Sequence, residues 1–102
     1  MSALLIFSVY RGTVKSDLLE FLNCLEKSFY IQGFDCAYCI DGPVPIEIES
    51  ILSDFFRSFS GRYYVFRSPE SMGLAYSLNR LIAFGTSAQY QFFVRADTDD
   101  LF

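Results

Sequence analysis

Residues 4–9 read LLIFSV and residues 34–40 read FDCAYCI, and the segment between them has the spacing of a helix. A short apolar run is typical of a strand that is buried on both faces of a sheet. In the intervening segment, Asp17 and Glu20 have capping-box spacing, and Gln32-Gly33 ends the pattern. The apolar positions of this segment are Leu18, Phe21, Leu22, Leu25 and Phe29. The sequence therefore predicts a strand–helix–strand unit with parallel strands.

The same alternation continues along the rest of the chain. Pro45 suits the first turn of a second helix, whose apolar stripe runs over residues 48–59 and which Ser60-Gly61 closes. Residues 63–66 and 90–95 predict a third and a fourth strand. The helix between them has the apolar positions Leu74, Leu78, Leu81 and Ile82, with Gly85 as its C-cap. The order βαβαβαβ predicts an α/β fold of three α/β/α layers around a mostly parallel, Rossmann-like sheet.

Length and composition set bounds on the domain and on its chemistry. The 102 residues predict one domain over residues 1–102, and a hydrophobic content of 52% is enough to fill a core. The net charge of −4 argues against non-specific binding to nucleic acid, which needs a basic face. Because the chain has no His, catalytic triads, zinc sites and general bases built on His are excluded.

The cysteines are Cys24, Cys36 and Cys39, an odd number that favours a reducing setting over a disulfide framework. Cys36 and Cys39 have the spacing of half a zinc knuckle or of a redox pair. On a strand, however, positions three apart point to opposite faces. We therefore expect these thiols to have a structural role in the core.

Polar residues gather where the predicted strands end, and ligands of open parallel sheets bind beyond those carboxyl ends. The strand ends carry Tyr10-Arg11, Asp41-Gly42, Arg67-Ser68 and the segment 95–99. Asp97, Asp99 and Asp100 repel one another, by roughly 1 kcal/mol for a pair about 4 Å apart in water. A divalent Mg²⁺ or Mn²⁺ would relieve that repulsion. The same acids could instead cap the start of a helix, and their spacing alone leaves both interpretations open.

Two further residues, Asp41 and Gly73, have two interpretations each. Asp41 could accept hydrogen bonds from a base or sugar, or close an Asx-type turn. Gly73 could let the backbone approach a phosphate, or only begin the third helix. Asn79 is predicted to lie inside a helix although its helix propensity is modest, which hints at a polar partner without identifying it.

Taken together, four ordered motifs resemble those of family 2 glycosyltransferases of the GT-A type. The motifs are Ser8-Val9-Tyr10, Asp41-Gly42-Pro43, Gly73-Leu74-Ala75 with Leu78-Asn79, and Val94-Arg95-Ala96-Asp97-Thr98-Asp99-Asp100. The resemblance covers nearly the whole chain, and the order and spacing of the four make it more specific than any single motif. It favours the metal interpretation of the Asp cluster.

The resemblance implies a nucleotide-sugar-binding half of a GT-A enzyme. Tyr10 and Asp41 match the residues that hold the nucleotide, and Arg95 matches a basic residue that precedes the DXD motif. Asp97 and Asp99 match the DXD motif itself, which holds the ribose and the metal-bound diphosphate. The predicted nucleotide-sugar-binding residues are Ser8, Tyr10, Asp41, Asn79, Arg95 and Asp97. The predicted ligands of Mn²⁺ or Mg²⁺ are Asp97 and Asp99.

The implied activity is inverting, metal-dependent transfer of a sugar from a nucleoside diphosphate donor, expected to be UDP-linked, to an acceptor hydroxyl. Bacterial surface polysaccharide synthesis is the expected setting, with a glycan or lipid-linked acceptor. Family members continue beyond the DXD motif through an acceptor-binding region and a carboxylate base. We therefore expect the N-terminal part of a longer cytoplasmic enzyme. The full-length protein could act at the inner face of the membrane. This part would bind the donor and transfer nothing alone.

Two other classes remain as alternatives. A non-catalytic αβ interaction domain would use Asp41 and the acids of residues 97–100 only as caps and turns. A phosphoacceptor receiver-like domain also has an acidic rim on a parallel sheet, but it needs acids where this chain has Tyr10-Arg11.

Overall fold

The computed structural model describes residues 2–98, except for the side chains of residues 28–32, and its seven elements follow the predicted order. The elements are β1 (Ala3–Tyr10), α1 (Lys15–Gln32), β2 (Asp35–Asp41), α2 (Ile46–Arg57), β3 (Tyr63–Ser68), α3 (Leu74–Ser87) and β4 (Phe92–Arg95). The predicted α/β class is confirmed, and the strand boundaries move by no more than two residues.

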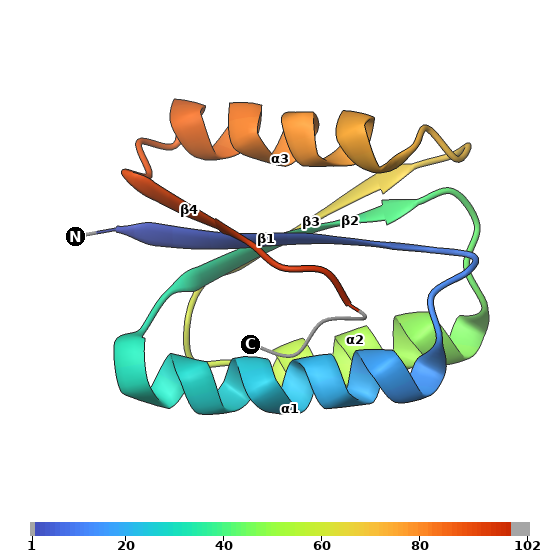
Figure 1. Cartoon of the computed structure of the whole chain (residues 1–102), viewed down its shortest axis with the longest axis horizontal. Coiled ribbons are helices and arrows are strands. Elements are labelled where there is room, and N and C mark those ends of the chain that lie inside the picture. The colour runs from blue at the N-terminus through green and yellow to red at the C-terminus, as the bar shows by residue number, and fades with distance from the viewer. Residues whose placement is uncertain (1, 99–102) are drawn as a thin grey trace.

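The four strands form one sheet in the order β3-β2-β1-β4, and each neighbouring pair is parallel. The register pairs Tyr10 with Asp41 and Asp41 with Ser68, so β1, β2 and β3 end side by side. Helices α1 and α2 cover one face of the sheet and α3 covers the other (Figure 1). The three-layer α/β/α arrangement is therefore confirmed.

The alternation of side chains along β1 and β2 builds a core on each face of the sheet. Phe7 of β1 packs on the α1 and α2 side, where its ring lies 4.9 Å from that of Phe21 and 5.1 Å from that of Tyr38. Cys36 belongs to this core and Cys39 to the core beneath α3, which confirms that the two thiols point to opposite faces. Burial raises the pKa of the Cys36 thiol, so it stays protonated.

Several predicted helix details are wrong. Gly85 lies inside α3, which is followed by Ala88 as its C-cap. Of the predicted apolar positions of this helix, Leu78 and Leu81 are buried, whereas Leu74 and Ile82 are 47% and 41% exposed. Pro45 is the residue before α2 and not part of its first turn. Asp17 lies within the first turn of α1, which begins at Lys15, so it does not cap that helix. The periodicity therefore locates each helix but leaves its ends uncertain by one or two residues.

Gly85 is needed for close packing of α3 on the sheet, and we expect Gly85→Ala to destabilise the chain. A Cβ at this position would lie 2.3 Å from Cε1 of Phe93 and 2.8 Å from Cδ2 of Leu4. The better helix propensity of alanine offsets about 1 kcal/mol, whereas overpacking costs about 1–3 kcal/mol. Urea unfolding should show a net loss of stability. An unchanged or higher stability would contradict this packing.

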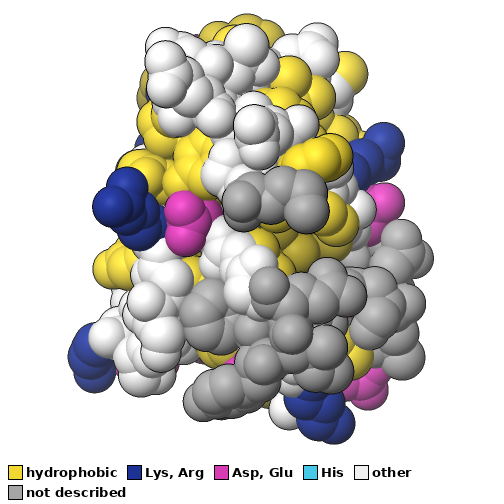
Figure 2. Space-filling model, turned by 90° about the vertical axis from the view of Figure 1, so that its left-hand side faces the viewer, with side chains coloured by type: hydrophobic (Ala, Val, Ile, Leu, Met, Phe, Trp, Pro, Cys, Tyr) yellow, Lys and Arg dark blue, Asp and Glu magenta, His cyan; other side chains and the backbone are white. Residues whose placement is uncertain are grey.

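At the amino-terminal end of the sheet, hydrogen bonds to Asp35 join the segments that lead into β3 and β4 to the start of β2. The Tyr90 hydroxyl donates to Oδ2 of Asp35 at 2.5 Å, and the Arg62 amide donates to Oδ1 at 3.0 Å. Burial, followed by the bond to Asp35, raises the pKa of Tyr90. Figure 2 faces this end, and the charged side chains visible there are scattered instead of gathered in one patch.

None of the helices in the described part of the chain combines the length and the apolar character that a membrane crossing requires.

Candidate functional site

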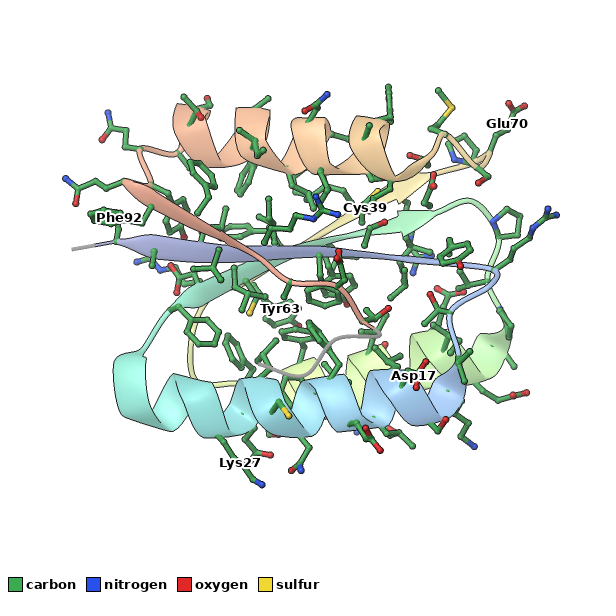
Figure 3. The ribbon with its side chains drawn as sticks, in the orientation of Figure 1. Asp17, Lys27, Cys39, Tyr63, Glu70 and Phe92 are labelled. Carbon is green, nitrogen blue, oxygen red and sulfur yellow. The ribbon has the colours of Figure 1, made fainter. Side chains whose placement is uncertain are left out.

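A pocket of about 550 Å³ lies at the carboxyl ends of the central strands. Its walls come from the ends of β1 and β2, the start of α1, the loop before α3 and the segment after β4. The lining residues are Ser8, Tyr10, Gly12, Thr13, Val14, Asp17, Asp41, Ser71, Gly73, Leu74, Asp97 and Thr98. Asp17 and the loop residue Glu70 are labelled at this end in Figure 3. The pocket therefore occupies the place where parallel α/β sheets bind ligands.

Asp41 ends β2 and ties the pocket to the loop that precedes α3. Its side chain is 4% exposed, and its Oδ1 accepts the Met72 amide at 2.7 Å while Oδ2 accepts the Gly73 amide at 3.0 Å. Hydrogen bonds from amides to a carboxylate are stronger than those between neutral groups. The Asx-turn interpretation is therefore wrong, because the bonds cross from one strand to a loop about 30 residues further along. Each carboxylate oxygen keeps a second lone pair for a ligand.

Two glycines let this loop approach Asp41 closely. Gly42 has φ +79°, and a Cβ there would lie 2.8 Å from the backbone nitrogen of Ser71. Gly73 is the N-cap of α3 with φ +96°, and no heavy atom lies within 4 Å of where its Cβ would be. Gly42 is thus needed for contact between two backbone segments, and Gly73 leaves open space at the start of α3.

Tyr10 forms the rim of the pocket after β1. Its amide donates to Oγ1 of Thr13 at 3.0 Å, and its carbonyl accepts the Thr13 amide at 3.0 Å, which closes a tight turn. A Cβ on Gly12 would lie 2.5 Å from Cε2 of Tyr10, so the ring packs directly over that glycine. The ring is 52% exposed, which leaves an aromatic surface available to a ligand. Below it, the Ser8 hydroxyl donates to the Cys39 carbonyl at 3.3 Å.

Asp97 lies where the chain leaves the sheet after β4. The Ala96 amide still donates to the Ile6 carbonyl at 3.1 Å, so the backbone remains fixed up to the residue before Asp97. Nε of Arg95 donates to Oδ1 of Asp97 at 3.3 Å, and the Asp97 side chain is 35% exposed. The turn after β4 thus brings the positively charged guanidinium of Arg95 beside Asp97, the predicted metal ligand two residues further along.

The pocket lining is acidic. Asp17, Asp41 and Asp97 all line it, and none of the described lining residues is Lys or Arg. An anionic ligand such as a diphosphate would be repelled by each carboxylate, by roughly 1 kcal/mol at about 4 Å in water. Carboxylates are ligands that Mg²⁺ and Mn²⁺ prefer. The donor set therefore fits a divalent cation that would bind together with an anion.

The described part of the chain alone does not assemble a complete metal cage. Within residues 2–98 no group of three or more Cys, Asp or Glu side chains has the geometry to hold a metal ion. Asp97 is the predicted metal ligand that lies within the described residues, and it lines the pocket while also accepting Nε of Arg95. The second predicted metal ligand, Asp99, lies outside the described residues. A cation held by few protein ligands would share its other positions with water and phosphate, as Mg²⁺ usually does.

The structure brings four of the predicted nucleotide-sugar-binding residues into this one pocket: Ser8, Tyr10, Asp41 and Asp97. Arg95 lies beside the pocket through its bond to Asp97. Asn79 does not line it and is exposed on α3. The prediction did not include Asp17, Thr13 or Thr98, which also line it. Their place between the end of β1 and the first turn of α1 is the signal that could have identified Thr13 and Asp17.

The chain has a Rossmann-like α/β fold, with an all-parallel sheet flanked by helices on both faces. Among solved structures, the chain is similar to the crystal structure of S. aureus TarS, a glycosyltransferase. The TM-score is 0.72 at 20% sequence identity, and the match covers 99% of this chain.

The match covers 17% of the TarS chain, so this chain corresponds to a small part of that protein. At this level of identity the likeness shows the fold, which this chain shares with part of a glycosyltransferase. No protein-family profile matches the chain, and no curated protein matches it significantly.

Proposed function

We propose that the pocket at the carboxyl ends of β1 and β2 binds the nucleoside diphosphate part of a sugar donor, as the donor-binding part of a family 2, GT-A-type glycosyltransferase. The observation that carries this proposal is the convergence of Ser8, Tyr10, Asp41 and Asp97 on one pocket from the ends of three different strands. The likeness of the fold to TarS supports the same class of enzyme.

Each side chain has a role that follows from its surroundings. The half-exposed ring of Tyr10 offers a face for stacking against the nucleotide base, which we take to be uracil. Asp41 accepts a hydrogen bond from the base or ribose with a lone pair that the Met72 and Gly73 amides leave free. These contacts orient the nucleotide before any chemistry takes place.

The diphosphate lies toward Asp97, where the acidic lining requires a cation. Asp97 and Asp99 would hold Mn²⁺ or Mg²⁺, which supplies Lewis-acid stabilisation of the charge on the leaving diphosphate. Arg95 contributes a second positive group, because its guanidinium has donors left beside the one bonded to Asp97.

For the whole enzyme we propose inverting transfer to an acceptor hydroxyl in bacterial surface polysaccharide synthesis, in the cytoplasm. A carboxylate outside this chain would act as general base. The 102-residue chain would then bind the donor nucleotide without transferring sugar. A radiolabelled UDP-sugar donor incubated with the chain and glycan acceptors should yield no glycosylated product. Formation of such a product would show that the chain carries its own base.

The proposal predicts that Asp97→Asn weakens UDP binding by about tenfold or more in the presence of Mn²⁺, since a charged ligand contact is worth about 1.5–3 kcal/mol. Isothermal titration of the purified chain with UDP, with and without Mn²⁺, measures the effect. The matched control is Asp54→Asn, which removes the same charge from an exposed position on α2.

The interaction-domain alternative predicts a different result for the same variants. A carboxylate that only caps a turn would cost about 1 kcal/mol of stability when replaced and would leave UDP binding unchanged or absent. Equal UDP affinity for Asp97→Asn and Asp54→Asn would therefore contradict the proposed donor site.

A further inference from the structure

A second groove, separate from the acidic pocket, runs along the outer edge of β3. It has a volume of about 590 Å³ and lies between α2 on one side and α3 on the other. The residues that line it are Tyr38, Ser53, Phe56, Arg57, Tyr63, Val65, Phe66, Arg67 and Arg80. It shares no lining residue with the acidic pocket.

The floor of this groove is the open edge of a strand. β3 is the last strand in the order β3-β2-β1-β4. The carbonyls of Arg62 and Ser68 accept amides of the β2 side, from Cys36 and Gly42, at 3.0 Å each. Because backbone groups alternate in direction along a strand, the peptide groups of Tyr63 and Val65 point away from β2. They are placed to pair with another extended chain.

The end of this edge is already occupied. Nη1 of Arg80, from α3, donates to the Arg67 carbonyl at 2.8 Å and lies 3.4 Å from the Ser68 hydroxyl. This contact confirms that the Arg67 carbonyl faces outward, and it limits an added strand to the first part of β3. The guanidinium of Arg80 also lies 5.2 Å from the centre of the Phe66 ring, which holds it in place.

The groove is basic in an otherwise acidic molecule. Arg57, Arg67 and Arg80 are three of the eight Lys and Arg residues, and the chain has twelve Asp and Glu. None of the described residues that line the groove is acidic. Arg57 pairs with Asp54 and Arg67 with Glu49, but both guanidiniums are more than 60% exposed. The Arg57–Asp54 pair is exposed on both sides and therefore weak, and the Arg67 guanidinium keeps further donors beside the one bonded to Glu49, so a ligand carboxylate can bind at both arginines.

The groove also has an apolar part. Tyr63 is 44% exposed and Val65 is 42% exposed, although both lie on a strand. The Tyr63 ring stacks on Phe56 with centroids 5.1 Å apart, so it is fixed in position. A ligand that lies along β3 would therefore meet a rigid aromatic surface followed by guanidinium groups.

We propose that the outer edge of β3 binds an extended, acidic peptide segment that adds a strand to the sheet. The peptide groups of Tyr63 and Val65 supply main-chain hydrogen bonds, and the guanidiniums of Arg57 and Arg67 bind its carboxylates. A second copy of this chain paired through the same edge would bring a second set of these guanidiniums close to the first, and like charges repel. The charge of the groove thus favours an acidic partner.

The test uses the full chain and two fluorescein-labelled, end-blocked peptides, one alternating threonine with glutamate and one alternating threonine with glutamine. Fluorescence anisotropy at low salt should show binding of the glutamate peptide at least about tenfold tighter than that of the glutamine peptide. Raising the salt concentration should remove most of this difference.

Matched variants locate the site. Arg57→Gln and Arg67→Gln should each weaken the glutamate peptide about threefold, whereas Lys27→Gln, which removes a charge that points away from the sheet (Figure 3), should not. Val65→Pro removes an outward amide and should weaken binding about tenfold, while Val65→Thr keeps that amide and should bind normally. Amide NMR spectra establish that each variant is folded. The arginine variants still decide the question if Val65→Pro fails to fold.

Equal binding of the two peptides, or equal effects of Lys27→Gln and Arg67→Gln, would overturn the proposal. Concentration-dependent dimerisation of the chain that Val65→Pro abolishes would also overturn it, in favour of a second copy as the occupant. None of these results depends on UDP, so the proposal stands or fails independently of the donor site.

Discussion

Gly42→Ala is expected to lower the free energy of unfolding by about 3 kcal/mol. The residue has φ +79°, a left-handed conformation that costs an L-residue about 1–2 kcal/mol. In addition, its Cβ would lie 2.8 Å from the Ser71 nitrogen and 3.1 Å from the Ser71 Cα, both of which are backbone atoms. The loop before α3 would have to move away from Asp41. Urea unfolding followed by circular dichroism measures the change.

Gly33→Ala is the matched control for this variant. Gly33 has a similar φ of +70°, but beyond its two chain neighbours no residue has a heavy atom within 4 Å of where its Cβ would be. Gly33→Ala should therefore lower the free energy of unfolding only by the conformational cost of a left-handed alanine, about 1 kcal/mol. If the two variants lose the same stability, the close contact between Gly42 and the loop is not a feature of the folded protein.

Asp41→Asn is expected to cost about 3 kcal/mol of stability, although the two side chains have nearly the same shape. The amide group of asparagine can accept only one of the two bonds, and its NH₂ would face the amide of Met72 or Gly73. One buried amide would thus lose its partner, and the remaining bond would lose the charge that strengthens it.

Chemical denaturation of Asp41→Asn beside Asp54→Asn tests this result. The side chain of Asp54 is 71% exposed, so its replacement should change stability by less than about 0.5 kcal/mol. We also expect Asp41→Asn to abolish UDP binding, because the pocket loses the fixed loop that forms one of its walls. An Asp41→Asn chain as stable as the wild type would show that the carboxylate does not hold the loop.

The sequence predicted the fold well because the signals were local and strong. The short apolar run of β1 is typical of a strand buried on both faces, and both faces are buried, with Phe7 in one core and Ile6 in the other. The sequence predicts the ends of helices less reliably than it predicts the strands. Gly85 has the local appearance of a C-cap, and only the approach of Leu4 and Phe93 reveals that it is a packing residue within α3.

The part of the candidate site that follows directly from the strand ends could also be predicted from the sequence. Tyr10, Asp41 and Asp97 follow strands, so the parallel topology alone places them at one end of the sheet. Asp17 belongs to a helix that packs against the face of the sheet, and its helical spacing suggested a cap. Its position on the pocket wall depends on how the loop after β1 turns, which the bonds between Tyr10 and Thr13 determine. The two bonds of Asp41 to the loop before α3 join distant segments and leave no local signal.

The central claim is that a nucleoside diphosphate binds, with a divalent cation, in the pocket at the carboxyl ends of β1 and β2. Amide NMR of the chain during titration with UDP and Mg²⁺ tests it most directly. The account predicts that the largest shifts occur at Tyr10, Asp41, Gly73 and Thr98, that they require the cation, and that the amides of Arg62 and Phe92 at the other end of the sheet do not shift. Shifts confined to other surfaces, or no shifts with UDP and Mg²⁺ together, would contradict the account.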